Sequence, residues 1–328
     1  MNEIDSIINY LNKNKIKYEK DFLIKKISYI KIGGIVPLYI KPETIEIFID
    51  LIKYLNINGL IYKVVGNISN CLFDDININK IFISTHNINK INFIDENTIE
   101  VESGVMLPKF VKMMAQKSIT GFEGLVGIPG TIGGSLFMNA GAYYDNEISD
   151  HLISVNCLDI NNNIVFIEKD KCDFSFRNSF FQKNPRNIIL YSRFNLIYGN
   201  QDDIYKKIEY CQYHRKKYQE SKYPNLGSLF KTKDIYLDMA KTDRIYKIFL
   251  WIYRMINRLF KNKDSKTLNY ITCKYFKINF NDDKPFSDKT INCMVNRGNL
   301  NFKKAMDFIC QMRNVLKNTV ELEIEIVN

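Results

Sequence analysis

Residues 121–143 read GFEGLVGIPGTIGGSLFMNAGAY and contain seven of the fifteen glycines of this 328-residue chain. An even spread at the average usage of about 7% would place only one or two glycines there. Glycine at this density permits positive φ and lets backbone N–H groups approach a ligand closely. Successive N–H groups of this kind bind phosphate. The segment therefore predicts either a nucleotide-binding loop or a glycine-rich structural loop.

The spacing of these glycines excludes two common nucleotide sites. A dinucleotide-binding fold shows G-x-G-x-x-G directly after a strand, and a P-loop ends in Gly-Lys-Ser/Thr. Neither pattern occurs in the segment. Standard dinucleotide and nucleoside-triphosphate sites are therefore excluded for it.

Short helical and extended patterns flank the glycine-rich segment on both sides. Runs rich in β-branched residues predict strands, and apolar residues at helical spacing predict helices. We expect a loop over 121–143 and helices over 44–55, 108–116, 203–219 and 302–316. The middle of residues 231–285 is also expected to be strongly helical. Strands are expected over 38–40, 62–65, 81–84, 90–94, 98–101, 153–158, 164–168, 188–194 and 320–327. This mixture predicts an α+β fold.

Composition excludes several classes of protein. Hydrophobic residues make up 46% of the chain, so it is not disordered and can bury a core without a metal or disulfide. The seven cysteines are scattered and form no CxxC pair, which excludes a zinc site and favours a reducing compartment. No signal pattern or apolar run long enough to span a membrane is present, so we expect a cytoplasmic protein.

The formal charge of +10 does not by itself indicate a nucleic-acid partner. Only nine of the 46 basic residues are Arg, and lysine richness of this kind is a weak signal. Residues 231–285 hold 13 Lys and Arg against six Asp, so most of the excess lies there. We therefore expect no nucleic-acid binding by the remainder of the chain.

Seven motifs occur in the order found in the UDP-N-acetylenolpyruvoylglucosamine reductases, which this sequence closely resembles. They are KIGG (31–34), VGNISNCLFD (65–74), the glycine-rich segment, FRNSFFQ (176–182), RKKYQ with PNLGSLFK (215–219 and 224–231), FSDKTINCMVNRGN (286–299) and LEIEI (322–326). The resemblance covers about residues 20–231 and 286–328. The spacing between the arginine and serine motifs is similar to the shorter subclass, which lacks an extra tyrosine-bearing loop.

The resemblance implies the fold and the reaction. The fold is the FAD-binding PCMH-type, vanillyl-alcohol-oxidase-like flavin fold, with subdomains over 1–85 and 86–197 (about 29–195 overall), a substrate domain over 198–318, and a returning strand over 319–328. NADPH reduces non-covalently bound FAD, which then delivers hydride to the enolpyruvyl double bond of a UDP-sugar during peptidoglycan precursor synthesis. We expect a monomer without a resident metal.

Three catalytic residues follow from the resemblance. Arg177 stabilises the enolate, Ser228 donates the proton with Lys231 as its support, and Glu325 polarises the substrate carboxylate. From the residues alone, Arg177 could form a surface ion pair and Ser228 could belong to a turn. Glu325 shares one face of an alternating strand with two other glutamates, all of which could be solvated.

The resemblance also supplies the binding residues. Arg215, Lys216 and Gln219 are candidates for the diphosphate end of the UDP-sugar, although a solvated helix face explains them equally well. The residues expected to bind FAD are Gly66, Asn67, Ser69, Asn70, Ile128, Pro129, Gly130, Thr131, Gly133, Gly134, Asn139 and Gly141.

Four departures from the family pattern stand out. Ile68 replaces a glycine of the pyrophosphate loop and is costly if that position has positive φ. Phe176 replaces a tyrosine, and Thr290 replaces a histidine. Residues 232–285 lack the glycine-rich motif that is usual for the family, and they include about 25 additional residues.

Residues 245–260 of this atypical segment predict an amphipathic helix. Its apolar residues recur at helical spacing, with Trp251, the only tryptophan, beside them. We expect this stripe to pack on the substrate domain, and membrane-surface docking or a protein contact is the alternative. The stripe consists of Ile245, Ile248, Phe249, Ile252, Ile256, Leu259 and Phe260.

Two other functions compete with the reductase. A flavin oxidase of the same fold often tethers its flavin through a histidine, but His86, His151 and His214 do not lie in such motifs. A diverged, non-catalytic flavin- or nucleotide-binding protein is the other alternative, favoured by Ile68 and the atypical segment.

Overall fold

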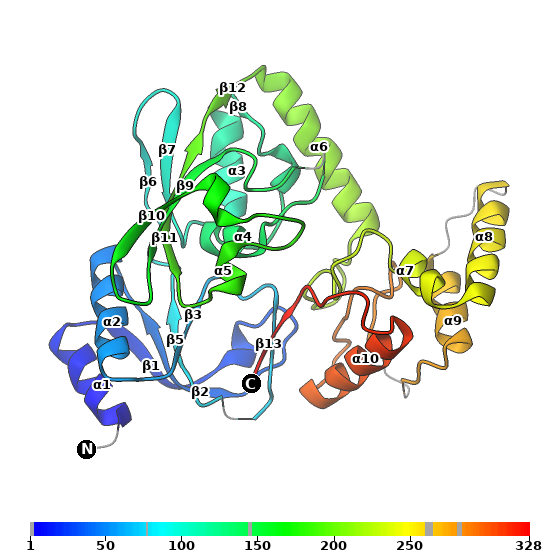
Figure 1. The fold of residues 1–328 in the computed structure, drawn as a ribbon, viewed down its shortest axis with the longest axis horizontal. Coiled ribbons are helices and arrows are strands. Elements are labelled where there is room, and N and C mark those ends of the chain that lie inside the picture. The colour runs from blue at the N-terminus through cyan, green and yellow to red at the C-terminus, as the bar shows by residue number, and fades with distance from the viewer. Residues whose placement is uncertain (1–2, 77, 144–145, 260–264, 281–283) are drawn as a thin grey trace. The chain divides into compact units, whose positions relative to one another are not determined.

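The computed structural model describes residues 3–76, 78–143, 146–259, 265–280 and 284–328 (Figure 1). The chain forms two compact units, each made of separate stretches of sequence. The first comprises Met1–Phe22, Ile35–Ile68 and Ile78–Lys217, and the second comprises Leu23–Gly34, Ser69–Asn77 and Tyr218–Asn328. Because both units are discontinuous, the polypeptide passes between them several times.

A four-stranded sheet with two helices forms one part of the first unit. Its strand order is β1-β2-β5-β3, and β5 runs parallel to both of its neighbours. The bounds are β1 Lys17–Leu23, β2 Ile35–Lys41, β3 Tyr62–Val65, β5 Ile81–Ser84, α1 Glu3–Lys13 and α2 Ile45–Ile57. Apolar residues of α1 and α2 share one buried cluster with those of the sheet. Thr44 begins α2, because its Oγ1 accepts a hydrogen bond from the backbone N–H of Ile47.

An antiparallel five-stranded sheet forms the other part of the first unit. Its strand order is β10-β9-β11-β7-β6, and α3 packs its buried face against it through Phe110 and Met114. A two-stranded ribbon and three further helices complete this part. The bounds are β6 Ile91–Phe93, β7 Thr98–Glu102, β8 Ile119–Thr120, β9 Leu152–Leu158, β10 Ile164–Glu168, β11 Ile188–Asn195, β12 Ile197–Tyr198, α3 Leu107–Gln116, α4 Ile132–Met138, α5 Phe180–Lys183 and α6 Gln201–Tyr218.

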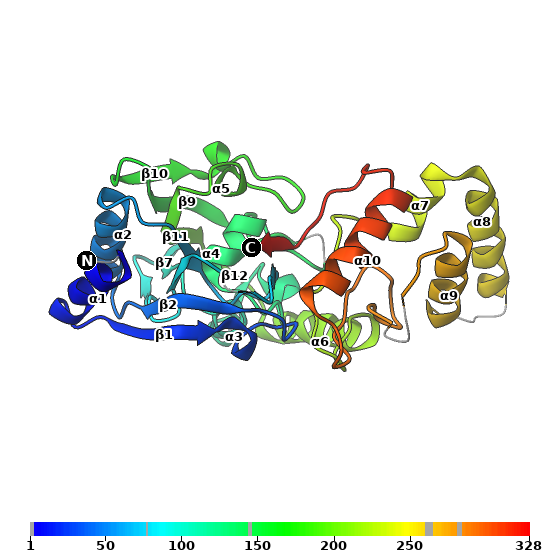
Figure 2. The same ribbon diagram turned by 90° about the horizontal axis from the view of Figure 1, so that it is seen from below.

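Helices form most of the regular secondary structure of the second unit. Strands β4 and β13 pair in parallel, and four helices build one buried cluster with Leu72 of β4. Figure 2 shows α7, α8, α9 and α10 from a second direction. The bounds are β4 Cys71–Phe73, β13 Glu325–Val327, α7 Ile235–Thr242, α8 Arg244–Leu259, α9 Ser265–Tyr275 and α10 Phe302–Val315. In the described residues, no helix is both long and apolar enough to cross a membrane.

Most elements predicted from the sequence are confirmed, with two exceptions outside α8. The glycine-rich segment is not entirely loop, because α4 lies inside it. The side-chain oxygen of Thr131 accepts a hydrogen bond from Gly134 N, and Ile132 and Leu136 are buried, which compensates for poor helix propensity. The predicted strand 320–327 is also wrong in extent. Only 325–327 form a strand, while residue 322 makes an isolated bridge with Phe230.

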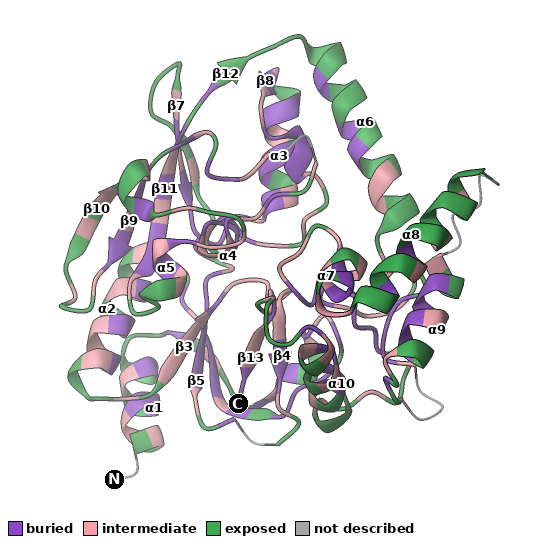
Figure 3. Ribbon diagram, turned by 45° about the vertical axis from the view of Figure 1, so that its right-hand side comes forward, coloured by how far each residue is buried: buried purple, intermediate pink, exposed green. Residues whose placement is uncertain are grey.

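The orientation of α8 contradicts the packing expected from its sequence. Of the expected buried stripe, Phe249 alone among the described members packs on the core. Ile245, Ile248, Ile252, Ile256 and Leu259 are exposed, and Phe260 lies outside the described residues. Figure 3 shows α8 exposed along most of its length. The helix instead buries Tyr246 and Leu250. Burial of Tyr246 is tolerated because its hydroxyl hydrogen-bonds to Thr272 Oγ1 at 2.7 Å, and its ring packs against Phe276.

Candidate functional site

Two distant stretches of the first unit meet at Gly66. A Cβ on Gly66 would lie much closer to Thr131 Oγ1 than van der Waals contact allows, so only glycine fits. The neighbouring Asn67 donates through Nδ2 to the carbonyl oxygen of Pro129 at 2.8 Å. The loop after β3 and the glycine-rich segment therefore form one continuous surface, and four predicted cofactor residues lie on it.

Ile68 occupies the left-handed conformation that a glycine would favour. Its φ is +44°, and its side chain is buried, with 6% exposed. The left-handed backbone costs about 1–2 kcal/mol for a non-glycine residue. Burial of a full isoleucine side chain contributes about 1.5–3 kcal/mol in the opposite direction. The isoleucine is therefore accommodated by packing.

Buried polar oxygens lie around the start of α4, where its backbone packs closely on Ser103. Gly133 N donates to Ser103 O at 2.8 Å, and a Cβ on Gly133 would meet Ser103 Cβ at 2.8 Å. Among the described residues, Ser103 Oγ, Ser135 Oγ and Asn139 Oδ1 are buried without a hydrogen-bond partner. Each such atom costs about 1–3 kcal/mol unless a ligand satisfies it. Hydroxyl and amide groups bind phosphate and ribityl oxygens, so these residues fit a dinucleotide cofactor such as FAD.

Arg177 is fixed at the carboxyl end of the glycine-rich segment. Its guanidinium donates to Asn139 O at 3.3 Å and to Gly141 O. Asn139, with φ +44°, ends α4, and its Nδ2 donates to Glu147 Oε2 at 2.6 Å. Arg177 itself has a φ of +54° and stacks over the Phe176 ring, 5.0 Å from its centroid. The replacement of tyrosine by phenylalanine at 176 therefore retains an aromatic surface under the arginine.

A second arginine approaches the same segment from α6. The Arg215 guanidinium lies 5.5 Å from the centroid of the Tyr143 ring, and its Cδ packs on Gly127, which has a φ of +77°. Burial lowers the pKa of Arg215, and the positive charge of Arg177 lowers it further. Two guanidinium groups that repel each other in a partly buried site favour an anion beside them.

Ser228 lies in a cavity of the second unit. Gly227, with φ +77°, precedes it, and the buried Leu229 and Phe230 follow it. Asn292 fixes these neighbours, because its carbonyl oxygen accepts from Leu229 N at 2.7 Å and its Oδ1 accepts from Phe230 N at 2.9 Å. Ser228 is therefore exposed, next to the turn at Gly227 and the two buried residues Leu229 and Phe230.

The cavity at Ser228 has a volume of about 360 Å³. Its described lining includes neither Lys231 nor Glu325, although both belong to the same unit. Residues of the atypical segment contribute much of the wall, so this segment is part of the site. The lining residues are Ser228, Thr232, Lys233, Asp234, Ile235, Tyr236, Arg254, Leu268, Thr290 and Asn292.

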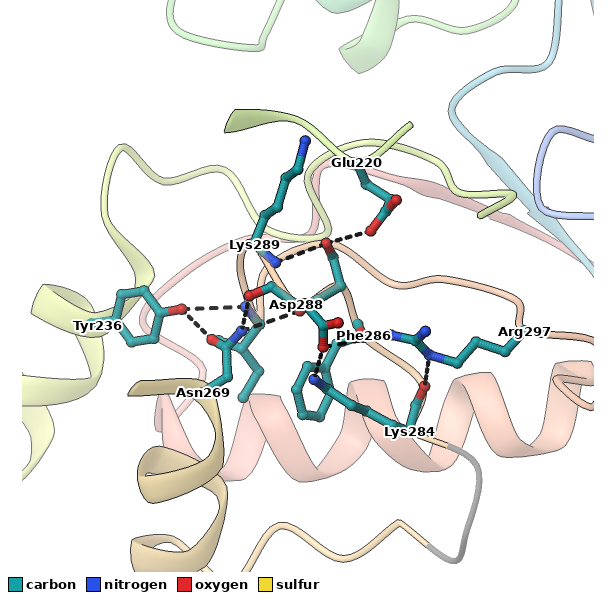
Figure 4. Close-up of polar contacts among 10 residues, drawn as sticks. Glu220, Tyr236, Asn269, Lys284, Phe286, Asp288, Lys289 and Arg297 are labelled. Atoms are coloured by element: carbon teal, nitrogen blue, oxygen red, sulfur yellow. Dashed lines mark hydrogen bonds and ion pairs between the residues drawn. The ribbon is translucent and has the colours of Figure 1, made fainter. Parts of the chain in front are cut away.

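A polar network ties the atypical helices to the segment 286–299 (Figure 4). The Tyr236 hydroxyl from α7 contacts Asn269 Oδ1 from α9 and accepts from Ile291 N at 3.4 Å. Asn269 donates to the carbonyl oxygen of Ser287 at 3.1 Å, and Ser287 Oγ donates to Glu220 Oε2 at 2.6 Å. Burial raises the pKa of Tyr236 to about 12, so its hydroxyl stays protonated at neutral pH.

Glu325 lies on β13 beside the pyrophosphate loop. Its backbone N donates to Asn70 O at 2.9 Å, and Asn70 Nδ2 donates to Glu323 O at 2.8 Å. Cys71 Sγ is 3.7 Å from Glu325 Oε2. Two predicted residues, Asn70 and Glu325, are thus adjacent in the second unit. Arg177 belongs to the first unit.

The other predicted residues are distributed as follows. Lys231 Nζ pairs with Glu321 Oε2 at 3.1 Å, so this lysine has a carboxylate partner. Lys216 and Gln219 are exposed, at the end of α6 and just beyond it. Ser69 and Ile128 are half-buried, Gly130 packs near Ser135 Oγ, and Pro129 and Gly134 are exposed.

Several residues near the site were not predicted from the sequence. Ser103 and Ser135 carry unsatisfied hydroxyls, and Asn292 fixes the serine turn. His151 packs on Gly121, and the His214 ring lies 6.2 Å from that of Tyr143, although both histidines are outside the glycine-rich segment in sequence. Only Ser135 and Asn292 lie within recognisable motifs, so the other residues carried no local signal.

Comparisons with known proteins agree on a flavin-binding chain. Residues 36–167 match the sequence family described as FAD binding domain. A UDP-N-acetylenolpyruvoylglucosamine reductase of Caldicellulosiruptor saccharolyticus is 37% identical over 226 residues, 67% of this chain and 71% of the relative. A reductase of the same name from Clostridium tetani is 29% identical over 321 residues, 98% of this chain and 94% of the relative.

A solved structure extends the likeness to the fold. The UDP-N-acetylenolpyruvylglucosamine reductase of Thermus caldophilus matches with a TM-score of 0.71 at 22% identity, covering 95% of this chain and all of that one. This likeness, with the matched FAD binding domain, confirms the predicted α+β flavin fold.

Proposed function

The chain belongs to the UDP-N-acetylenolpyruvoylglucosamine reductase family, and on that premise we propose how its own residues perform the reaction. The protein is an FAD-dependent oxidoreductase that reduces the enolpyruvyl double bond of UDP-N-acetylglucosamine enolpyruvate, giving UDP-N-acetylmuramate for peptidoglycan synthesis. NADPH is the reductant. FAD, when bound, supplies the electron pair for the double bond.

The residues that hold FAD line the surface at Gly66 and α4. The glycines at 66 and 133 let the segments of this surface pack closely, because a Cβ would collide with Thr131 or Ser103. Ser103, Ser135 and Asn139 supply polar atoms that lack protein partners among the described residues. The other residues that we assign to FAD are Asn67, Ser69, Asn70, residues 128–131, Gly134 and Gly141.

The observation that carries the proposal is the fixed position of Arg177. Its guanidinium is held by the carbonyl oxygens of Asn139 and Gly141, so its charge is presented at the end of the cofactor segment. An enolate that develops next to the substrate carboxylate is stabilised by a permanent cation in fixed geometry. Arg177 is therefore assigned to the substrate carboxylate.

Ser228 supplies the proton that the α carbon requires. Gly227 and the anchored Leu229 and Phe230 hold its hydroxyl at the cavity surface. As the hydroxyl O–H bond breaks, the α-carbon C–H bond forms, and the serine then recovers a proton from water. Lys231 supports the transient alkoxide by its charge.

Glu325 completes the set by polarising the carboxylate end of the substrate, beside Asn70. Arg215, Lys216 and Gln219 are assigned to the diphosphate, since arginine and lysine bind phosphate oxygens well. We further propose that the enzyme is monomeric and acts in the cytoplasm, which the absence of disulfides among its seven described cysteines supports. The proposal includes no nucleic-acid partner.

One experiment tests the function as a whole. The purified protein should be yellow, release FAD on acid precipitation, and oxidise NADPH only when UDP-N-acetylglucosamine enolpyruvate is present. Flavin that stays with the precipitate would indicate a covalent oxidase instead. A flavin-bound protein without substrate-dependent turnover would indicate a non-catalytic relative.

A further inference from the structure

Helix α8 presents a continuous apolar face to solvent. Seven large apolar side chains on it have exposed fractions between 40% (Ile252) and 72% (Leu259). They recur at helical spacing over the whole helix, which at 1.5 Å per residue is about 24 Å long. The seven residues are Ile245, Ile248, Trp251, Ile252, Met255, Ile256 and Leu259. A soluble surface rarely tolerates so many adjacent large apolar groups unless something covers them.

The face is anchored by a well-packed opposite side. Tyr246 and Leu250 are buried in the core of the second unit, and Tyr246 makes a buried hydrogen bond with Thr272 of α9. Arg254 pairs with Asp234 at 2.6 Å, which holds α8 beside the start of α7. The helix therefore cannot turn its apolar face inward without losing these contacts.

Basic side chains border the apolar face. Lys247, Arg254 and Arg258 are exposed and lie along one edge of the helix, with Arg244 at its first position. Neither α8 nor α9 contains an aspartate or glutamate, and α9 adds the exposed Lys266 and Lys274. Trp251 lies between the basic edge and the apolar centre, the place where tryptophan is enriched at a water–lipid boundary.

We propose that α8 docks the protein on an anionic lipid surface. The helix would lie in the plane of the interface, with its apolar face in the acyl region and its basic edge against the headgroups. A second copy of the chain is a poorer occupant, because paired α8 helices bring like charges together with no carboxylate on either helix. An anionic lipid surface suits both parts of the helix, because its acyl region covers the apolar face and its headgroups pair with the basic edge.

The sole tryptophan makes the proposal directly measurable. Trp251 is 65% exposed, so its fluorescence emission reports transfer from water to lipid. The complete protein should show a blue shift with phosphatidylcholine vesicles that contain phosphatidylglycerol. The shift should be much smaller with phosphatidylcholine alone and should weaken as salt is added. Flotation of the same mixtures gives an independent readout of binding.

Matched variants assign binding to the face. Ile248→Glu with Ile252→Glu should lower the partition coefficient at least about tenfold. Lys247→Glu with Arg258→Glu should abolish the preference for anionic vesicles. Ile57→Glu changes a still more exposed isoleucine on α2 (79% exposed) and should leave partitioning unchanged. Reductase turnover of each variant confirms that it is folded.

Three results would overturn the proposal. The first is no blue shift and no flotation with anionic vesicles. The second is an equal loss of partitioning in the α2 control variant. The third is a blue shift that depends on protein concentration alone and accompanies a doubled mass in light scattering, which would assign the face to a second copy.

Discussion

The glycine-rich segment 121–143 and helix α8 leave opposite kinds of group unsatisfied. Around α4, buried oxygens of Ser103, Ser135 and Asn139 have no partner in the described part of the chain. On α8, large apolar side chains have no cover. Folding alone would avoid both arrangements, because each costs free energy. Ser135 and Asn139 belong to the glycine-rich motif, whereas α8 lies in the segment 232–285, which departs from the family pattern.

The largest effect is expected at Ser228, whose cavity is lined largely by residues of the atypical segment. Ser228→Ala should lower kcat about 10²–10⁴-fold, because the proton donor is lost. Rapid-mixing absorbance should show normal flavin reduction by NADPH and slow reoxidation by substrate. Ser228→Cys keeps a donor and should recover part of the rate.

The control for this prediction is Ser221→Ala. Ser221 is an exposed serine of the same connection that does not line the cavity. Its turnover should match the parent. Normal turnover by Ser228→Ala would remove the serine from the mechanism and leave the cavity without a catalytic role.

Arg177→Lys should give the next largest effect. Lysine keeps the charge but cannot donate to two carbonyl oxygens and a carboxylate in one rigid plane. We expect a loss of about 2–3 kcal/mol in transition-state stabilisation, measured as kcat/KM for the enolpyruvyl sugar. Arg186→Lys, an exposed arginine between α5 and β11, should be silent. Equal kinetics for the two variants would contradict the role of Arg177.

Gly66→Ala tests whether the glycine-rich surface is a cofactor site or merely a packed loop. The added Cβ collides with Thr131 Oγ1, and overpacking of this kind costs about 1–3 kcal/mol. FAD affinity, measured by titration of apoprotein, should fall about tenfold or more. Gly59, unlike Gly66, has a positive φ, but no atom lies within 4 Å of the Cβ that Gly59→Ala adds, so this variant should bind FAD normally. Parallel losses in both variants would indicate general destabilisation.

Ile68→Gly should have the smallest effect. Relief of the left-handed strain contributes about 1–2 kcal/mol, whereas loss of the buried side chain costs about 2–5 kcal/mol. Urea unfolding should therefore show a net destabilisation of about 1–2 kcal/mol. A more stable variant would mean that strain, rather than packing, dominates at this position.

Much of the first unit could be predicted from sequence because its signals are local. Strands 62–65 and 81–84 have the expected bounds, and Pro108 lies in the first turn of α3 as its pattern requires. The role of glycine in the flavin segment could also be predicted, since glycine density is visible without a structure. The meeting of Arg177 with Asn139 and Gly141 joins positions 36 or more residues apart, so no local pattern reveals it.

The second unit was less predictable because tertiary packing overrides periodicity there. The apolar stripe of α8 indicated its buried face, yet Tyr246 and Leu250 occupy the core, and every described member of the stripe except Phe249 is exposed. Buried tyrosine is favoured here by a hydroxyl partner, Thr272, which lies on another helix. Periodicity measures how apolar a face is, and it cannot say whether the protein or a partner covers it.

The most direct test of the reductase assignment separates the two halves of the reaction under anaerobic conditions. One equivalent of NADPH should bleach the flavin absorbance of the purified protein. Addition of UDP-N-acetylglucosamine enolpyruvate should then restore it, with stoichiometric UDP-N-acetylmuramate detected by mass spectrometry. A flavin that is bleached by NADPH and stays bleached after the enolpyruvyl sugar is added would contradict the assignment of the protein as a reductase of this sugar.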